Sequence, residues 1–273
     1  MPAVPTPIHS RRALLYGAAA LLWPLPRLAW AQGKGQLPLS VAINRSGKMR
    51  ALSQRASKAY VQATLNVLPD KAREISLSSQ RIMAGNINDL AGGNPPPDVR
   101  KLLQVLEKDT ADLTTLLAGT PRRESNMDVA AAADVMLGSA DRLTKAYEGL
   151  SQQSSAKIVN VAGRQRMLSQ RAARGYFLIA AGHDTPPVRK QLEDARAEFK
   201  QALASLQAAP ISTPAIRNEL ELAAAQWLFY EGALTKTPSP ETLQTVATTS
   251  ERVFEVMDNL TSMYDAALRD LLG

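Results

Sequence analysis

The pattern of apolar and polar positions predicts helices throughout and no strands. Apolar residues recur at intervals of three and four, as in the leucines between positions 102 and 117, and this is the period of a helix with one buried face. Clusters of proline and glycine interrupt the pattern, and a proline inside a helix removes a backbone hydrogen bond. These clusters lie at 68–70, 92–98, 119–121, 182–187, 209–214 and 235–240. The sequence therefore predicts an all-α fold, with four helices on each side of a polar link at 151–156.

One stretch of seventeen residues occurs twice. Residues 44–60 read NRSGKMRALSQRASKAY and residues 160–176 read NVAGRQRMLSQRAARGY, with nine identical positions at an offset of 116. An unrelated pair of this length would share about one position. The helix breaks of the two halves also correspond at offsets of 116 to 117. We therefore predict a tandem duplication into domains 32–152 and 153–273.

Each of these domains is predicted to be an up-down four-helix bundle. An even number of helices returns the chain to the end where it began, so the two motif helices run parallel and are related by a pseudo-two-fold axis. An alternative joins the fourth and fifth helices into one long helix.

The motif places polar residues on one helix face and apolar residues on another. Its Gly, Arg and Gln follow each other at steps of three and four, and therefore share a face. A glycine inside a helix costs about 0.5–1 kcal/mol relative to alanine, which indicates close approach of a backbone or a ligand. The second face carries Met49, Leu52, Ala56, Ala59, Tyr60 and Ala63, and is predicted to meet the core.

If the two motif helices face each other, their arginines converge, and a small oxyanion between them would replace repulsion by charge-assisted hydrogen bonds. The alternative is solvated arginines beside tightly packed glycines. Under the first hypothesis the ligand-binding residues are Asn44, Gly47, Arg50 and Gln54 in the first copy, and Asn160, Gly163, Arg166 and Gln170 in the second. For Arg55 and Arg171 we expect hydrogen bonds that brace neighbouring helices. Tyr60 and Tyr176 are expected in the core, with their hydroxyl groups paired.

The first 31 residues have the pattern of a secretory signal peptide. Arg11 and Arg12 precede an apolar run at 13–22, and Ala29-Trp30-Ala31 provides a small-x-small cleavage site, as in twin-arginine signals. A membrane anchor is the alternative, but the apolar run is too short to cross about 30 Å of hydrocarbon as a helix. We therefore predict export to the periplasm and no membrane span after signal cleavage.

Composition excludes several classes of function. The chain has a net charge of +7, and the predicted signal holds three arginines and no acid, which leaves about +4 spread along the helices and argues against nucleic-acid binding. Cysteine is absent and histidine occurs twice, so disulfides and thiolate sites are excluded. No Glu-x-x-His motif is present. The sequence thus predicts no catalytic residue, no metal site and no cofactor.

The motif carries a resemblance to known sensors. The segment AGRQRMLSQR at 162–171 resembles the N-terminal domain of PilJ-type methyl-accepting chemotaxis transducers. The wider pattern N-x-x-G-x-x-R-x-L-S-Q-R resembles the P-box of nitrate/nitrite sensor kinases of the NarX and NarQ type. That resemblance implies a periplasmic four-helix bundle in which paired P-box helices hold one nitrate. By motif position, the nitrate-binding arginines fall on Arg50 and Arg166, and the glycines on Gly47 and Gly163.

Two hypotheses of function follow from this resemblance. The first is a soluble periplasmic module that binds a small oxyanion such as nitrate or nitrite and acts through a membrane-bound sensor, chemoreceptor or transporter. In such a module the tandem repeat replaces the homodimer of the sensors, whose flanking transmembrane helices and output domain are not expected here. The alternative is a ligand-free helical adaptor of a pilus, chemoreceptor or envelope complex.

Overall fold

Eight helices account for nearly all of the residues that the computed structural model describes, 37–150 and 155–272, and those residues form no strand. The all-α prediction is thus confirmed. The predicted signal peptide at 1–31 and the link at 151–154 lie outside the described residues. The helices are α1 (Leu39–Thr64), α2 (Pro69–Gly92), α3 (Pro97–Leu117), α4 (Asn126–Gly149), α5 (Ser155–Ala180), α6 (Pro186–Gln207), α7 (Pro214–Leu234) and α8 (Pro240–Leu272).

Proline sets the first residue of α2, α3, α6, α7 and α8. The first turn of a helix suits proline, because the backbone N–H that proline lacks has no partner there and its φ angle is already helical. The N-terminus of α7 also has a side-chain cap, since the Thr213 hydroxyl accepts a hydrogen bond from the Ile216 N–H at 3.3 Å. The breaks expected from the sequence are therefore the boundaries of these helices.

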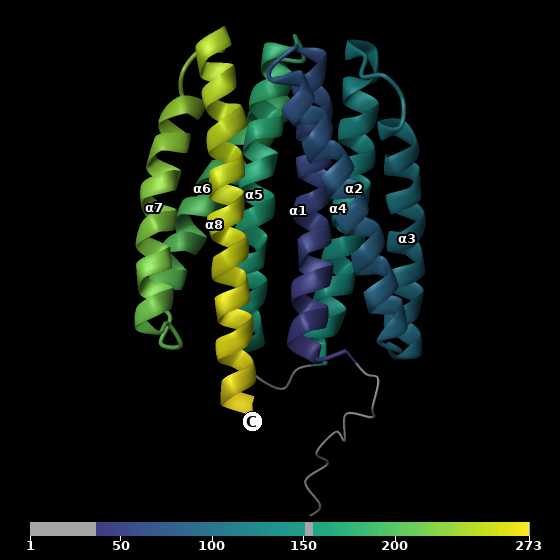
Figure 1. Cartoon of the computed structure of the whole chain (residues 1–273), viewed down its shortest axis with the longest axis vertical. Coiled ribbons are helices and arrows are strands. Elements are labelled where there is room, and N and C mark those ends of the chain that lie inside the picture. Colours follow the sequence, from purple (N-terminus) through teal and green to yellow (C-terminus); the bar gives the residue numbers. More distant parts are fainter. Residues whose placement is uncertain (1–36, 151–154, 273) are drawn as a thin grey trace, which may run out of the picture. The chain divides into compact units, whose positions relative to one another are not determined.

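The directions of the helices follow from contacts between them. Along α1 and α4, Arg50 contacts Asp141 and Gln54 contacts the Ala133 carbonyl, so these two helices are antiparallel. Helix α5 runs in the same direction as α1 (Figure 1). Helices α4 and α5 therefore run in opposite directions, which rules out the alternative of one long continuous helix.

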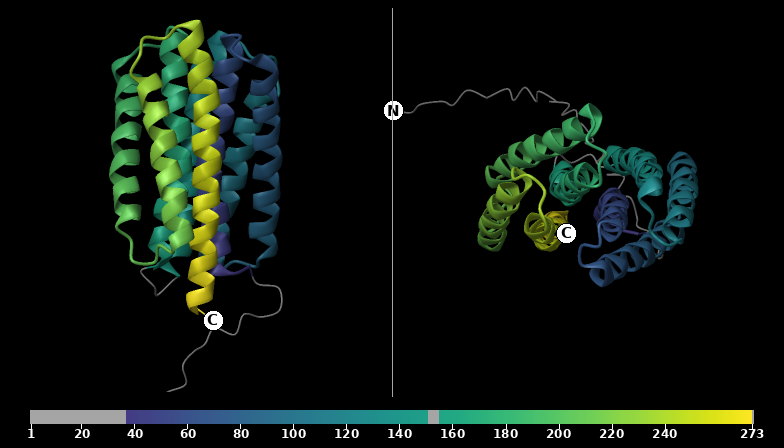
Figure 2. Two further views of the ribbon diagram at one scale, coloured as in Figure 1. Left: turned by 60° about the vertical axis from the view of Figure 1, so that its left-hand side comes forward. Right: turned by 90° about the horizontal axis from the view of Figure 1, so that it is seen from above.

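Helices α1 and α5 pack side by side, with α4 and α8 against them (Figure 2). Helices α2 and α3 lie outside α1 and α4, and α6 and α7 lie outside α5 and α8. Between residues 46 and 62 of α1, all but Lys48 and Arg55 are buried, and between residues 162 and 178 of α5, all but Arg164 and Arg171 are buried.

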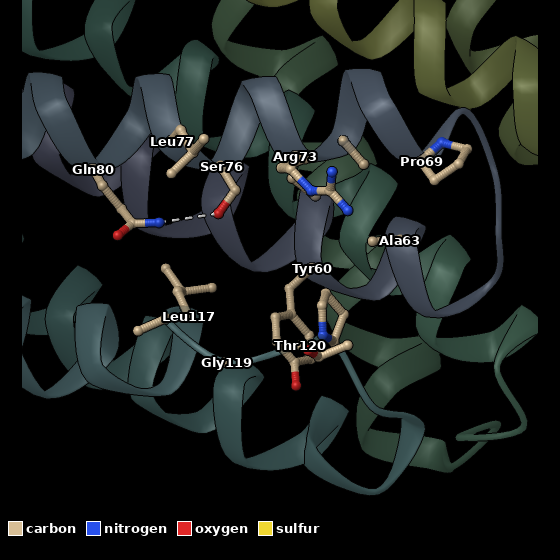
Figure 3. A pocket seen from close by; sticks show the side chains of 14 residues that line it. Tyr60, Ala63, Pro69, Arg73, Ser76, Leu77, Gln80, Leu117, Gly119 and Thr120 are labelled. Atoms are coloured by element: carbon tan, nitrogen blue, oxygen red, sulfur yellow. Dashed lines mark hydrogen bonds between the residues drawn. The ribbon is translucent and has the colours of Figure 1, made fainter.

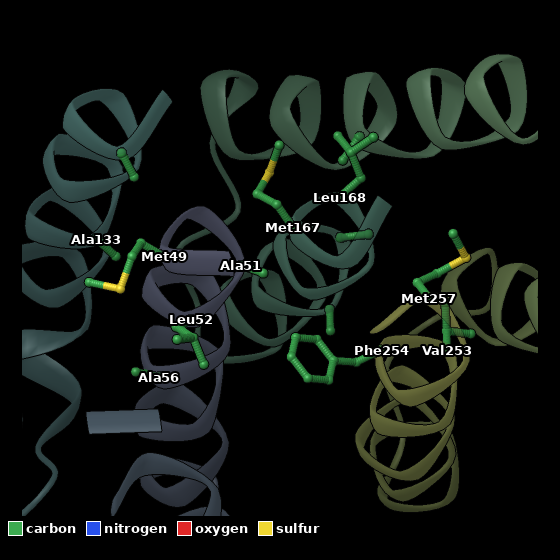
Figure 4. Close-up of a cluster of buried hydrophobic side chains, with 14 of the residues drawn as sticks. Met49, Ala51, Leu52, Ala56, Ala133, Met167, Leu168, Val253, Phe254 and Met257 are labelled. Carbon is green, nitrogen blue, oxygen red and sulfur yellow. The ribbon is translucent and has the colours of Figure 1, made fainter. Parts of the chain in front are cut away.

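This burial corrects the expectation of one core face and one ligand face on α1. The apolar residues Met49 and Leu52 are buried against α4 as expected (Figure 4). The polar face is buried as well, because α4 and α5 cover it: Gly47 lies against Thr144 of α4 and Arg166 of α5. A helix surrounded on all sides needs partners for its polar groups within the protein.

None of the described helices combines the length and apolar character that a membrane span requires.

Candidate functional site

The guanidinium groups of Arg50 and Arg166 converge where α1 meets α5. A Cβ atom added at Gly47 would lie 3.1 Å from Nη2 of Arg50 and 3.9 Å from Nη2 of Arg166, so both nitrogens are within 4 Å of one point. The same construction at Gly163 meets Arg166 Nη2 at 3.0 Å. Any larger residue at either position would press on a guanidinium group. The two glycines therefore leave room for the arginines.

Each arginine has a carboxylate partner on the adjacent helix of its own half. Arg50 donates from Nη1 to Asp141 of α4 at 2.8 Å, and Arg166 donates from Nη1 to Asp258 of α8 at 2.6 Å. The arginine side chains are each 1% exposed, whereas the two aspartates are 17% and 27% exposed. A buried charge without a partner would cost several kcal/mol, so these carboxylates are what permits the arginines to be buried.

The pKa values reflect this environment. Burial lowers the pKa of Arg50 to about 10, against the effect of Asp141, and burial also lowers the pKa of Arg166. Burial alone would raise the pKa of Asp141, but hydrogen bonds from Lys145 and Arg50 hold it below its ordinary value. With a pKa of about 10, Arg50 is charged at neutral pH.

A second set of ion pairs crosses from one half to the other. Lys48 of α1 contacts Asp258 of α8 at 2.7 Å, and Arg164 of α5 contacts Asp141 of α4 at 3.5 Å. Positions 48 and 164 are related by the motif offset of 116, and positions 141 and 258 are 117 apart. Each aspartate thus contacts an arginine of its own half and a cation of the other half.

The asparagines that precede the glycines lie on the same side of the arginine pair. Arg50 Nη2 donates to Oδ1 of Asn160 at 2.7 Å, and Asn160 donates from Nδ2 to Glu148 at 2.6 Å. Arg166 Nη2 instead donates to the backbone carbonyl of Asn44 at 3.3 Å. The side-chain oxygen of Asn44 is buried and has no hydrogen-bond partner among the described residues. The arrangement is therefore only approximately symmetric.

Further along α1, two cations contact Glu251 of α8. Lys58, which is fully buried, contacts Glu251 Oε1 at 2.6 Å, and Arg55 contacts Oε2 at 2.5 Å. Burial would raise the pKa of Glu251, but the charges of Lys58 and Arg55 lower it to about 2. The corresponding pair joins Arg174 of α5 to Asp134 of α4 at 3.0 Å.

The remaining motif residues brace helices rather than approach the arginine pair. Gln54 donates to the Ala133 carbonyl of α4 at 3.2 Å, and Gln170 donates to the Ser250 carbonyl of α8 at 2.8 Å. Arg55 braces α8 as expected. Tyr60 and Tyr176 are buried, and their hydroxyl groups have partners: the Tyr60 hydroxyl accepts from Arg122 N–H, and Tyr176 donates to the Lys236 carbonyl.

The sequence prediction missed the acidic partners. The recurrence of Asp141 with Asp258, and of Asp134 with Glu251, at an offset of 117 could have identified them. None of the site residues predicted from the sequence is a carboxylate. The recurrence of an acid at the repeat offset thus indicates a buried partner for the motif cations, whereas composition does not.

Comparison with protein families gives one match. Residues 150–251 match the family model described as PilJ, type IV pili methyl-accepting chemotaxis transducer N-term. The match covers less than half of the chain, and contains α5, α6, α7 and the beginning of α8. Comparisons with curated proteins and with solved structures gave no match.

The match confirms the PilJ-type resemblance for residues 150–251, where the segment is similar to the sensory N-terminal domain of a chemotaxis transducer. The likeness to nitrate sensors, and the tandem duplication, stay predictions.

Proposed function

We propose that this chain is a helical sensory module that binds one small oxyanion between Arg50 and Arg166. The observation that carries the proposal is the convergence of the two Nη2 atoms within 4 Å of one point at Gly47. Two guanidinium groups repel each other at this separation, and a planar oxyanion that accepts from both would remove the repulsion. Nitrate and nitrite are small planar oxyanions of this kind.

The charge balance around the arginines supports an anionic ligand. Five cations in this region form ion pairs with only three carboxylates, so positive charge is in excess. The cations are Lys48, Arg50, Lys145, Arg164 and Arg166, and the carboxylates are Asp141, Glu198 and Asp258. A fourth carboxylate, Glu148, contacts Asn160 rather than a cation of this set.

The proposed response to ligand begins at Asn160. Asn160 Oδ1 accepts a hydrogen bond from Arg50 Nη2. An incoming oxyanion would compete for this donor, and Asn160, once released, could move together with α5. Because Asn160 also contacts Glu148 near the end of α4, the shift would reach the helix ends. The signal would then pass to a membrane-bound sensor, chemoreceptor or transporter through a change in affinity.

Titration calorimetry with nitrate, nitrite and acetate tests the proposal. We expect at least one of the three to bind, and the double variant Arg50→Lys with Arg166→Lys to weaken binding by at least about tenfold, because lysine lacks the planar fork. The matched control is Arg174→Lys, a buried arginine that stands 116 positions after Lys58, and its affinity should be unchanged. Absence of binding by all three anions, or equal affinity of the double variant, would refute the site.

The alternative function as an adaptor has one specific observation in its favour. Leu228 and Phe229 on α7 are 71% and 72% exposed, which is unusual for side chains of this size. If the chain is an adaptor of a pilus, chemoreceptor or envelope complex, Phe229→Ser should abolish partner capture. The double arginine-to-lysine variant should leave capture unchanged.

A further inference from the structure

A cleft of about 680 Å³ lies between α1, α2 and the end of α3. Its wall on α1 begins at Ala59, more than two helical turns beyond Arg50, so the cleft is separate from the arginine pair. The volume is within the range of pockets that hold small organic ligands. No part of the oxyanion proposal uses this cleft.

The lining of the cleft is apolar along one part and polar along another. Leu77 of α2 and Leu117 of α3 face each other across the cleft, and Arg73 and Tyr60 lie further along it (Figure 3). Leu77 is 53% exposed, so a ligand that covers its side chain would bury apolar surface and be stabilised by that burial. The cleft therefore suits a molecule with an apolar body and a polar end.

The polar end of that molecule is indicated by Arg73. This side chain lines the cleft, and it forms no ion pair with any of the described residues. Helix α6 shows what is different: Lys190, the fifth residue of α6, pairs with Asp194, the ninth, at 2.7 Å. In α2 the fifth residue is Arg73 and the ninth is Leu77. An apolar residue thus stands where an acid neutralises the corresponding cation of α6.

A guanidinium group is a good partner for a carboxylate, because its planar fork can donate to both carboxylate oxygens. The Tyr60 hydroxyl is engaged elsewhere, since its oxygen accepts a hydrogen bond from the Arg122 N–H at 3.1 Å.

We propose that this cleft is a second ligand site, which binds an apolar monocarboxylate with its carboxylate on Arg73 and its apolar body between Leu77 and Leu117. The charge selects an anion, and the leucines select against small hydrophilic acids. The corresponding place on α6 offers neither feature, because Asp194 neutralises Lys190 and stands where α2 has Leu77.

Titration calorimetry with phenylacetate tests the proposal on the purified chain. Phenylacetate should bind, and phenylacetamide (no charge) and acetate (no apolar body) should bind at least about tenfold more weakly. Arg73→Gln should weaken phenylacetate binding at least about fivefold. Leu77→Asp should do the same by placing an acid four residues after Arg73, as on α6. Arg73 and Leu77 are both exposed, so the variants should fold, and circular dichroism checks this.

Two controls separate this site from the arginine pair. Arg81→Gln changes an exposed arginine of α2 that does not line the cleft, and should leave phenylacetate affinity unchanged. The double variant Arg50→Lys with Arg166→Lys should also leave it unchanged. The proposal is wrong if phenylacetate does not bind at about 5 mM, if Arg73→Gln binds equally well, or if only the double variant loses binding.

Discussion

The two halves of the helical unit, residues 37–150 and 155–272, have positive charges at corresponding motif positions, but some of these are lysines in the first half and arginines in the second. Lys58 of α1 corresponds by the motif offset to Arg174 of α5, and Lys48 corresponds to Arg164. Lys48 contacts one carboxylate, and Lys58 has the Ser250 hydroxyl as its one acceptor besides Glu251. Arg174 has two acceptors besides Asp134, the Ala130 carbonyl and Gln191. The half matched by the PilJ family model is the one with arginines. Charge alone is thus common to both halves, and the richer hydrogen bonding belongs to the second.

The largest effect on stability is predicted for removing a carboxylate that pairs with a buried lysine rather than with a buried arginine. Glu251→Gln leaves Lys58 buried without a carboxylate, and should lower the free energy of unfolding by about 3–5 kcal/mol. Asp134→Asn leaves Arg174 with two other acceptors, and should cost about 1–2 kcal/mol. Urea denaturation at pH 7 measures both, and equal losses would contradict the distinction between the two halves.

The same carboxylate makes stability depend on acid pH. The pKa of Glu251 is about 2 in the fold and 4.5 ordinarily, so its contribution is complete above pH 4.5 and is lost as the pH falls toward 2. At about 1.4 kcal/mol per pKa unit, this contribution amounts to about 3 kcal/mol. Denaturation midpoints between pH 7 and pH 2 should therefore fall less steeply in Glu251→Gln than in the wild type. Parallel curves would show that Glu251 carries no such contribution.

Substitution of the two motif glycines tests whether they serve helix packing or ligand binding. In Gly47→Ala or Gly163→Ala, the new methyl group lies about 3 Å from a guanidinium nitrogen, while helix propensity improves by roughly 0.5–1 kcal/mol. The net change in stability should therefore be within about 1 kcal/mol, and oxyanion affinity should fall about tenfold.

Gly85→Ala on α2 is the matched control, because a Cβ there meets no atom within 4 Å. It should stabilise the chain by roughly 0.5–1 kcal/mol and leave oxyanion affinity unchanged. Unchanged affinity in all three variants would mean that the motif glycines serve packing alone.

The smallest effect on stability is expected when a lysine of the first half is replaced by the arginine found at the corresponding position of the second. Lys48 is 24% exposed and contacts Asp258, so Lys48→Arg should change the free energy of unfolding by less than about 0.5 kcal/mol. A change above about 2 kcal/mol, measured by urea denaturation, would show that the lysine has a role beyond the ion pair.

The fold could be predicted from the sequence because its signals are local. Proline at the first turn and the period of three and four fix where helices begin and which residues are buried. The convergence of Arg50 with Arg166 was also predictable, because a repeated motif on packed helices places its members near the same axis. The burial of the polar face was not, since it depends on how α4 and α5 pack around α1. Nor could the cleft near Arg73 be predicted, because it is formed by three helices and a loop.

The most direct test of a single shared anion site is a double-mutant cycle on nitrate binding. Titration calorimetry should give one nitrate per wild-type chain, and Arg50→Lys and Arg166→Lys should each weaken binding nearly as much as the two together, because either guanidinium alone is insufficient. No nitrate binding, or two nitrates per chain with losses that simply add, would contradict a site built from both arginines.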